Sequence, residues 1–442
     1  MPRHLLGAAI VTALAVTLSG CGSNGGSNGG SGGGSGDDAL EIWIRQAPES
    51  ESAKTARKLA DAFTKASGVK TKVVALFDDF ETKLQQQAAQ KNLPDIVIND
   101  TAQLGNMRTQ GWLREVDKTK LKGGDQLADR AWQAAQAGDG KYYAAPFSAQ
   151  AFALIIRKDW REKVGLQPPQ TWDDLAKLAK AFTEQDPDGN GQKDTYGFVA
   201  PAGTKRGYAS WYASSLIYAN GGNFLSDGGG GKYTPAVNDP RTVEAVTWLQ
   251  DQFCVAKTVN PGAVSNDTTV THEVFEKGQG GIYLVGPYVL ARFVKSIGVD
   301  RLEVVKVPKG PSGGPGTLGE GENVYLMAGS GNEEGQRKFA EFAVSPEGQK
   351  IGMNKDEAGA IVRLPVNKGV DLATERSDPR WKVFQDAYAD AVYSSPVPNW
   401  APIRQLSADA INAVWADCGA DVKAAMDGLA AKLTAELQAQ TS

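Results

Sequence analysis

The stretch from residue 40 to residue 98 decides the fold class through three apolar segments, LEIWI at 40–44, KVVAL at 72–76 and LPDIVI at 93–98. The first alternates with the period of two that is typical of a strand, and the last suits a strand buried on both faces. An amphipathic helix that ends at Gly68 lies between the first two segments, and a second helix is expected over 78–90. This order predicts an α/β fold with a mostly parallel sheet.

The same alternation continues through the rest of the chain. Helix starts are indicated by Thr171 with Asp174 three residues later, by Asp239-Pro240 and by Ser345-Pro346. No repeat of about 20 to 50 residues is visible, which excludes a solenoid or a propeller. Further strands are expected at 152–157, 281–285, 302–307 and 323–327, and the last two helices at 407–416 and 421–438.

The first twenty residues have the features of an export signal. A cationic start with Arg3 precedes an apolar run of ~14 residues, which is too short to span a bilayer. The run ends in Leu-Ser-Gly directly before Cys21, which resembles the bacterial lipobox, where this cysteine is lipidated. Residues 22–36 contain only Gly, Ser and Asn and cannot form a core. We therefore expect a signal peptide at 1–20 and a lipidated tether at 21–36 on the extracytoplasmic face of a bacterial cell membrane; an ordinary secreted protein is the alternative.

The composition excludes several function classes. The formal net charge is −4 and the basic stretches are short, which argues against nucleic acid as a partner. The only histidines are His4 and His272, so that no histidine-based triad, relay or zinc site can be assembled. A body of ~400 residues is long enough for more than one domain.

Two cysteines, Cys254 and Cys418, remain in the body of the chain. In an oxidising extracytoplasmic compartment they are expected to form a disulfide if their Cα atoms come within ~7 Å. Two buried free thiols are the alternative, and neither cysteine is expected to be catalytic.

An acidic loop provides a candidate metal site. The sequence DPDGNGQKD at 186–194 supplies oxygens at the first, third, fifth and ninth positions and glycine at the sixth, as a calcium loop requires. Position twelve is Gly197 in place of the bidentate Glu. A metal-free loop rich in Asx turns is the alternative. The candidate ligands of a structural Ca²⁺ are Asp186, Asp188, Asn190, Gln192 through its backbone carbonyl, and Asp194.

The order of motifs over some 300 residues resembles the extracellular sugar-binding proteins of ABC importers, the relatives of maltose-binding protein. The resemblance is carried by LEIWI at 40–44, LPDIVI at 93–98 with GWL at 111–113, APFS at 145–148 leading into LIIRKD at 154–159, PPQTWDDL at 168–175, ANGG at 219–222 and GGIYLVGPY at 280–288.

The resemblance implies two α/β lobes with a ligand cleft between them, a periplasmic-binding-protein-like fold. By analogy, the N-terminal lobe takes 37–146 and 300–357, and the C-terminal lobe takes 147–299 and 358–442. The chain would then cross between the lobes near Pro146, Gly298 and Gly359. Function in such a fold is a hinge that closes on its ligand.

Sugar binding needs flat aromatic surfaces and a polar rim. Tyr288 and Trp211 match platform positions of the family, and Trp400 lies near the region of a third; a core role is the alternative for Trp211. The loops that follow strands are the physical expectation for polar ligand contacts in an open α/β sheet. They nominate Arg45, Gln46, Asn99, Asp100, Gln150, Glu320 and Glu322, with surface solvation as the alternative for each.

One departure makes maltose itself doubtful: the acidic and arginine pair of the maltodextrin binders falls here at Ala102 and Gln103, and their acid after the hinge falls at Gln150. We expect a monomeric, non-enzymatic protein that binds a carbohydrate and delivers it to an ABC permease with a cytoplasmic ATPase, without a required cofactor. An anchored carbohydrate-active enzyme with paired carboxylates and an importer protein for a non-sugar solute are the alternatives.

Overall fold

The computed structural model describes residues 39–355 and 358–441, and the chain from Ala39 onward forms one compact unit. The predicted signal peptide, the lipidated Cys21 and the tether over 21–36 lie outside the described residues. None of the helices within the described ranges is both long and apolar enough to cross a membrane.

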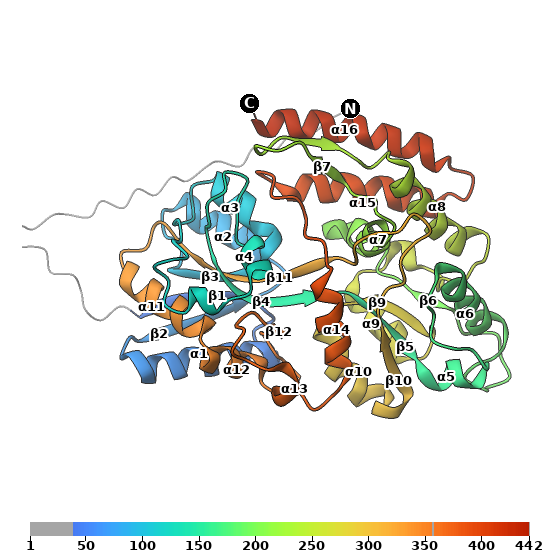
Figure 1. The fold of residues 1–442 in the computed structure, drawn as a ribbon, viewed down its shortest axis with the longest axis horizontal. Coiled ribbons are helices and arrows are strands. Elements are labelled where there is room, and N and C mark those ends of the chain that lie inside the picture. Colours follow the sequence, from blue (N-terminus) through green and yellow to red (C-terminus); the bar gives the residue numbers. More distant parts are fainter. Residues whose placement is uncertain (1–38, 356–357, 442) are drawn as a thin grey trace, which may run out of the picture. The chain divides into compact units, whose positions relative to one another are not determined.

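The larger sheet has six strands in the order β12-β4-β11-β3-β1-β2 (Figure 1). Strand β1 runs parallel to β2 and β3, whereas β11 runs antiparallel to both β3 and β4. The three strands of residues 40–98 are thus parallel as predicted, but the sheet as a whole is mixed, because β11 and β12 from late in the chain pair with it in the opposite direction. The strands are β1 (Leu40–Arg45), β2 (Thr71–Leu76), β3 (Ile96–Asp100), β4 (Ala145–Ala151), β11 (Gly319–Leu326) and β12 (Leu364–Pro365).

The second sheet has four strands in the order β10-β5-β9-β6, and a separate pair is formed by β7 and β8. Strand β5 is completely buried, as its run of apolar residues predicts. With helices on their faces, these sheets confirm the α/β class. The strands are β5 (Ala153–Arg157), β6 (Phe198–Val199), β7 (Leu225–Asp227), β8 (Tyr233–Pro235), β9 (Ile282–Val285) and β10 (Leu302–Val305).

Local capping signals place most helices correctly. Thr171 and Asp174 form the predicted capping box, and the side chains of Asp239 and Ser345 cap the helices that they precede. The helices are α1 (Glu51–Ser67), α2 (Phe80–Ala89), α3 (Leu104–Thr109), α4 (Asp129–Gln133), α5 (Lys158–Lys163), α6 (Trp172–Glu184), α7 (Tyr208–Ala219), α8 (Pro240–Cys254), α9 (Thr268–Glu276), α10 (Leu290–Ile297), α11 (Glu333–Val344), α12 (Pro346–Met353), α13 (Leu372–Glu375), α14 (Arg380–Ala389), α15 (Trp400–Ala416) and α16 (Val422–Thr441), with short 3₁₀ turns such as η1 (Thr101–Gln103) and η3 (Lys205–Gly207).

Helix α15 begins at Trp400, about two turns before the predicted start at Ser407. Pro402 is compatible with this start because the first turn of a helix has no internal partner for its N–H groups. Asn399 caps the helix by accepting a hydrogen bond from the backbone N–H of Ala401 at 3.1 Å. Trp400 therefore lies on a fixed helical turn.

The chain passes from one sheet to the other at positions that differ from the predicted crossings between the lobes. Strand β4 continues the larger sheet to Ala151 and β5 begins the smaller sheet at Ala153, so this passage lies at Phe152, later than Pro146. Strand β10 pairs with β5, which places the second passage after Val305 instead of near Gly298. Strand β12 pairs with β4, so Leu364 belongs to the larger sheet although 358–442 was expected in the other lobe. Such pairings are long-range and leave no local signal in the sequence.

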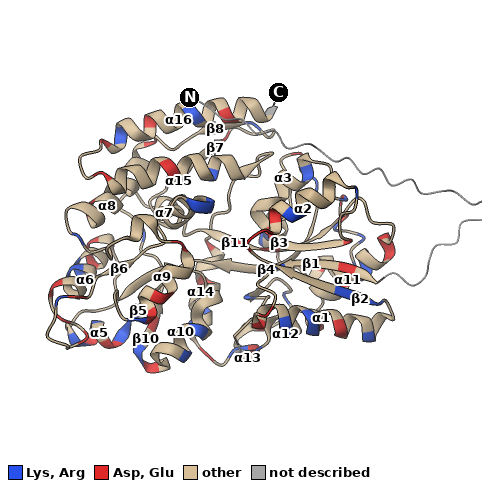
Figure 2. Ribbon diagram, turned by 180° about the vertical axis from the view of Figure 1, so that it is seen from behind, with Lys and Arg blue, Asp and Glu red and all other residues tan. Residues whose placement is uncertain are grey.

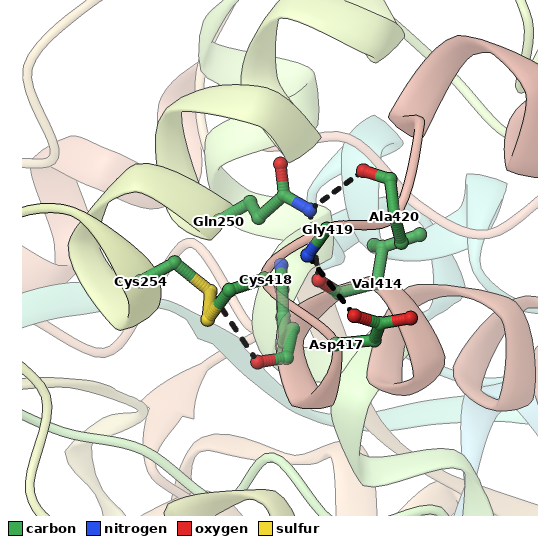
Figure 3. Close-up of a disulfide and its surroundings, with 8 residues drawn as sticks. Gln250, Cys254, Val414, Asp417, Cys418, Gly419 and Ala420 are labelled. Carbon is green, nitrogen blue, oxygen red and sulfur yellow. Dashed lines mark hydrogen bonds between the residues drawn. A yellow bond between two sulfur atoms is a disulfide. The ribbon is translucent and has the colours of Figure 1, made fainter.

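Cys254 at the end of α8 forms a disulfide with Cys418, between α15 and α16, with Cα atoms 5.4 Å apart (Figure 3). The side chain of Gln250, one turn earlier, donates hydrogen bonds to the backbone carbonyls of Val414 and Ala420. The disulfide and these bonds fasten the C-terminal helices to α8.

Acidic and basic residues are interspersed over the helices and strands (Figure 2). The described elements show no long stripe of one sign, in line with the small formal net charge of −4.

Candidate functional site

A cavity of about 510 Å³ lies between elements of the two parts of the fold, and we call it the central cavity. One wall comes from residues 101–105 and from α4 and the turn after it; the other comes from β7, β8 and residues 391–400. Among the residues predicted to bind ligand, Glu320 and Trp400 line this cavity. Trp400 is 8 % exposed and meets Phe224 edge to face, so its position is set by core packing.

Glu320 of β11 is held by two neutral donors. Trp211 Nε1 donates to one carboxylate oxygen at 2.8 Å, and Gln150 Nε2 donates to the other at 3.3 Å. Burial, with a further contribution from the negative charge of Asp100, raises the pKa of Glu320 to about 7. The structure therefore brings together three predicted residues, Gln150, Trp211 and Glu320, in one hydrogen-bonded group.

Trp211 and Tyr288 are packed against other rings, whereas an aromatic residue that stacks on a sugar has one face exposed. Trp211 is 9 % exposed, and its ring meets Phe152 and Tyr208 edge to face, with centroids 4.6 and 6.0 Å away. Tyr288 is half-buried and packs against His272. Neither aromatic residue lines the central cavity, and their role as platforms stays a prediction.

An ion-pair network connects the two parts of the fold. Arg45 Nε lies 3.3 Å from Glu81, and Arg45 Nη1 lies 3.6 Å from Asp100. Glu81, on α2, also accepts a hydrogen bond at 3.3 Å from Arg206 of η3. Arg45 and Asp100, both predicted to bind ligand, pair with each other, and their role in ligand binding stays a prediction.

The remaining predicted polar residues are not gathered at the central cavity. Gln46 follows β1 and is half-buried; Asn99 is buried and accepts a hydrogen bond from the backbone N–H of Asp100 at 2.8 Å. Glu322 is buried and pairs with Arg363 at 2.6 Å. Their roles in ligand binding stay predictions.

Two arginines near the site have no counterpart among the predicted site residues, and of these two Arg130 lines the cavity. Arg130 of α4 lines the cavity and lies over the rings of Tyr388 and Tyr393, 5.8 and 5.9 Å from their centroids. Arg404 of α15 follows Trp400 by four residues, which places both side chains on the same face of the helix. Only that spacing of four within the helix could have indicated Arg404 from the sequence.

The acidic loop 186–194 is held by its own hydrogen bonds. The carboxylate of Asp186 accepts bonds from the backbone N–H groups of Gly189, Asn190 and Gly191 at 3.0–3.1 Å, and Asn190 Nδ2 donates to Asp188 and Asp194. Within the described ranges, no group of three or more His, Cys, Asp or Glu residues is placed to hold a metal ion. Calcium binding by this loop, with the backbone carbonyl of Gln192 as one ligand, stays a prediction.

Comparison with known proteins identifies relatives over most of the chain. Residues 47–350 match the family model described as bacterial extracellular solute-binding protein. The polygalacturonan/rhamnogalacturonan-binding protein YtcQ of Bacillus subtilis is 27% identical over 346 residues, with 70% of this chain and 63% of the relative covered. A maltooligosaccharide ABC transporter solute-binding lipoprotein of Streptococcus pneumoniae is 23% identical, with 92% of each chain covered.

The fold has a close counterpart among solved structures. The GacH receptor of Streptomyces glaucescens, whose structures include a complex with acarbose, superposes with a TM-score of 0.76 at 20% identity, with 90% of this chain and 98% of the receptor covered. At this identity the superposition establishes the fold. With that fold and a family match over residues 47–350, the chain belongs to the bacterial extracellular solute-binding proteins.

Proposed function

We propose that this protein captures a carbohydrate outside the membrane and delivers it to an ABC permease. The observation that carries the proposal is the central cavity, whose lining includes both Trp400 and Glu320, the carboxylate that Trp211 and Gln150 hold. An aromatic face fits the C–H face of a sugar ring, and buried carboxylate and amide groups fit its hydroxyls. A cavity of about 510 Å³ lies within the usual range for small-molecule sites.

The relatives support a carbohydrate as the ligand class. They include a maltooligosaccharide ABC transporter solute-binding lipoprotein and a polygalacturonan/rhamnogalacturonan-binding protein. A solved structural neighbour from Thermotoga lettingae is bound to α-D-tagatose. Because the family consists of binding proteins, we infer that the chain binds its ligand without converting it.

The assembly around the protein is part of the proposal. A lipid on Cys21 would hold the monomeric body near a permease with a cytoplasmic ATPase, on the extracytoplasmic face of the membrane. The ion pair between Glu81 and Arg206 joins the two parts of the fold and would form on closure around the ligand.

The proposal is tested by a thermal-shift screen of the unlipidated mature chain against mono- and oligosaccharides. A ligand that binds the native state alone raises the melting temperature, so at least one sugar is expected to do so. If no glycan shifts the melting temperature, carbohydrate capture is wrong. Recovery of a hydrolysed sugar after incubation would favour a carbohydrate-active enzyme.

A further inference from the structure

Arg404 lies near the site, where its charge acts on Glu320, and it has unused hydrogen-bonding capacity. Its Nε is buried and has no hydrogen-bond partner, and its guanidinium has no carboxylate within 4.0 Å among the described residues. The side chain reaches this position because Gly207, with φ +72°, has no Cβ; a Cβ there would lie 2.4 Å from Arg404 Cγ. Guanidinium groups remain charged when buried, so this side chain is a fixed cation.

Arg130 is a second arginine whose hydrogen-bonding capacity is not fully used. Its Nε is also buried without a hydrogen-bond partner, and none of the described carboxylates lies within 4.0 Å of its guanidinium. Its contacts with Tyr388 and Tyr393 are those of a cation over aromatic rings. Two arginines from separate helices, α4 and α15, therefore lie at or near the site with no described carboxylate within 4.0 Å, although the charges of Glu320 and Asp100 act on Arg404.

The acidic groups around the cavity are already engaged. Glu320 accepts hydrogen bonds from the neutral donors Trp211 and Gln150, and its raised pKa leaves it partly protonated near neutral pH. Asp227, the other acid on the lining, is exposed and accepts the backbone N–H of Gly229 at 2.7 Å. Asp100 is paired with Arg45. The unused capacity near the site thus includes two cationic donors besides the neutral acceptor Gln150 Oε1, and the two cations call for an anionic acceptor in the ligand.

We propose that the sugar carries a carboxylate, as a uronic acid unit does, and that Arg404 binds this carboxylate with Arg130 as the second cation of the site. A guanidinium matches a carboxylate through two parallel N–H···O bonds, and in a desolvated cavity such charged bonds are stronger than bonds to a neutral hydroxyl. The inference rests on carbohydrate capture and specifies the class of sugar.

The test compares pairs of sugars that differ only at C6, such as galacturonate with galactose and their short oligomers. Isothermal titration of the mature chain is expected to show on the order of 10-fold or greater preference for the uronate. The Arg404→Gln variant is expected to lose most of this preference, and Arg404→Lys to retain part of it. Arg337→Gln, which removes an exposed arginine paired with Glu341 on α11, serves as the matched control and is expected to keep the full preference.

The outcomes distinguish a uronate ligand from carbohydrate capture in general, and they test the assignment to the two arginines. Binding of neutral sugars without preference for the uronate overturns the anionic ligand and leaves carbohydrate capture intact. Binding of neither member of any pair contradicts both proposals. If a preference exists but survives in Arg404→Gln and in Arg130→Gln, with wild-type circular dichroism in both variants, the assignment to these arginines is wrong.

Discussion

Glu320 is the ionisable side chain through which pH acts on the site. Its pKa is raised to about 7 from an ordinary value of 4.5 because it is buried, and it is surrounded by Asp100, Arg404, Tyr218 and Tyr288. A raised carboxyl pKa means that the folded state holds a proton that the unfolded state has lost between pH 4.5 and 7.

The stability contributed by this proton is therefore present at low pH and is lost as the pH rises towards 7. In the Glu320→Gln variant this loss is absent, so its melting temperature relative to wild type is expected to be higher by ~3 °C or more at pH 8 than at pH 5. Thermal unfolding across this pH range is the measurement. An identical pH profile in both proteins would show that Glu320 titrates normally.

Trp211 acts on Glu320 through a single hydrogen bond, which can be removed while an aromatic ring is kept. In Trp211→Phe the donor at 2.8 Å is lost, and the ionised form of Glu320 loses support. The pH midpoint of the stability change is expected to move upward, above 7, in the same unfolding series. An unmoved midpoint would mean that Gln150 alone holds the carboxylate.

At this scale the sequence nominated Gln150 and Glu320, which the structure places opposite each other on strands β4 and β11, while their role in ligand binding stays a prediction. It could not nominate Arg130 or Arg404, because the role proposed for them depends on the lack of a carboxylate within 4.0 Å among the described residues. That property depends on which helices meet in space.

Among the elements, the C-terminal helices depend on one covalent link. The disulfide between Cys254 and Cys418 closes a segment with a sequence separation of 164 residues. A link of this length restricts the unfolded chain strongly, so Cys254→Ser with Cys418→Ser is expected to lower the free energy of unfolding by about 2–5 kcal/mol. Denaturant unfolding of the double variant measures the loss, and addition of reductant to wild type should reproduce it. A loss below about 1 kcal/mol would contradict the role assigned to the link.

The acidic loop 186–194 leads to a prediction about the effect of Ca²⁺ on stability. Burial and the neighbouring carboxyl of Asp186 raise the pKa of Asp188, and the charge of Asp194 acts in the same direction. A bound Ca²⁺ would relieve this repulsion, so millimolar Ca²⁺ is expected to raise the melting temperature, and Asp188→Asn to abolish the rise. Equal melting temperatures in Ca²⁺ and in EDTA would establish the metal-free alternative.

Elements with local signals were predictable, and those defined by distant partners were not. Helix α6 begins where its capping box places it, whereas β4 has no periodic pattern and contains Pro146. Proline is tolerated there because the pairing of β4 with β11 shifts register next to Asn323, the residue opposite Pro146. The strand becomes recognisable only together with its partners.

For the whole molecule, the sequence predicted the α/β class and the family through the order of its motifs. The exact passages between the sheets depend on pairings such as β10 with β5, which join residues more than a hundred positions apart. The site combines residues from both sides of these passages, and Glu81 with Arg206 connects them. Ligand capture is therefore a property of the assembled body and of no single segment.

The most direct test is isothermal titration of the best sugar from the screen into wild type and into Trp400→Ala. Our account predicts one site per chain in wild type, recovery of unchanged sugar, and at least ~10-fold weaker binding in the variant, because Trp400 is the aromatic wall of the central cavity. Equal affinity in both proteins, with the variant correctly folded, would contradict sugar capture in this cavity.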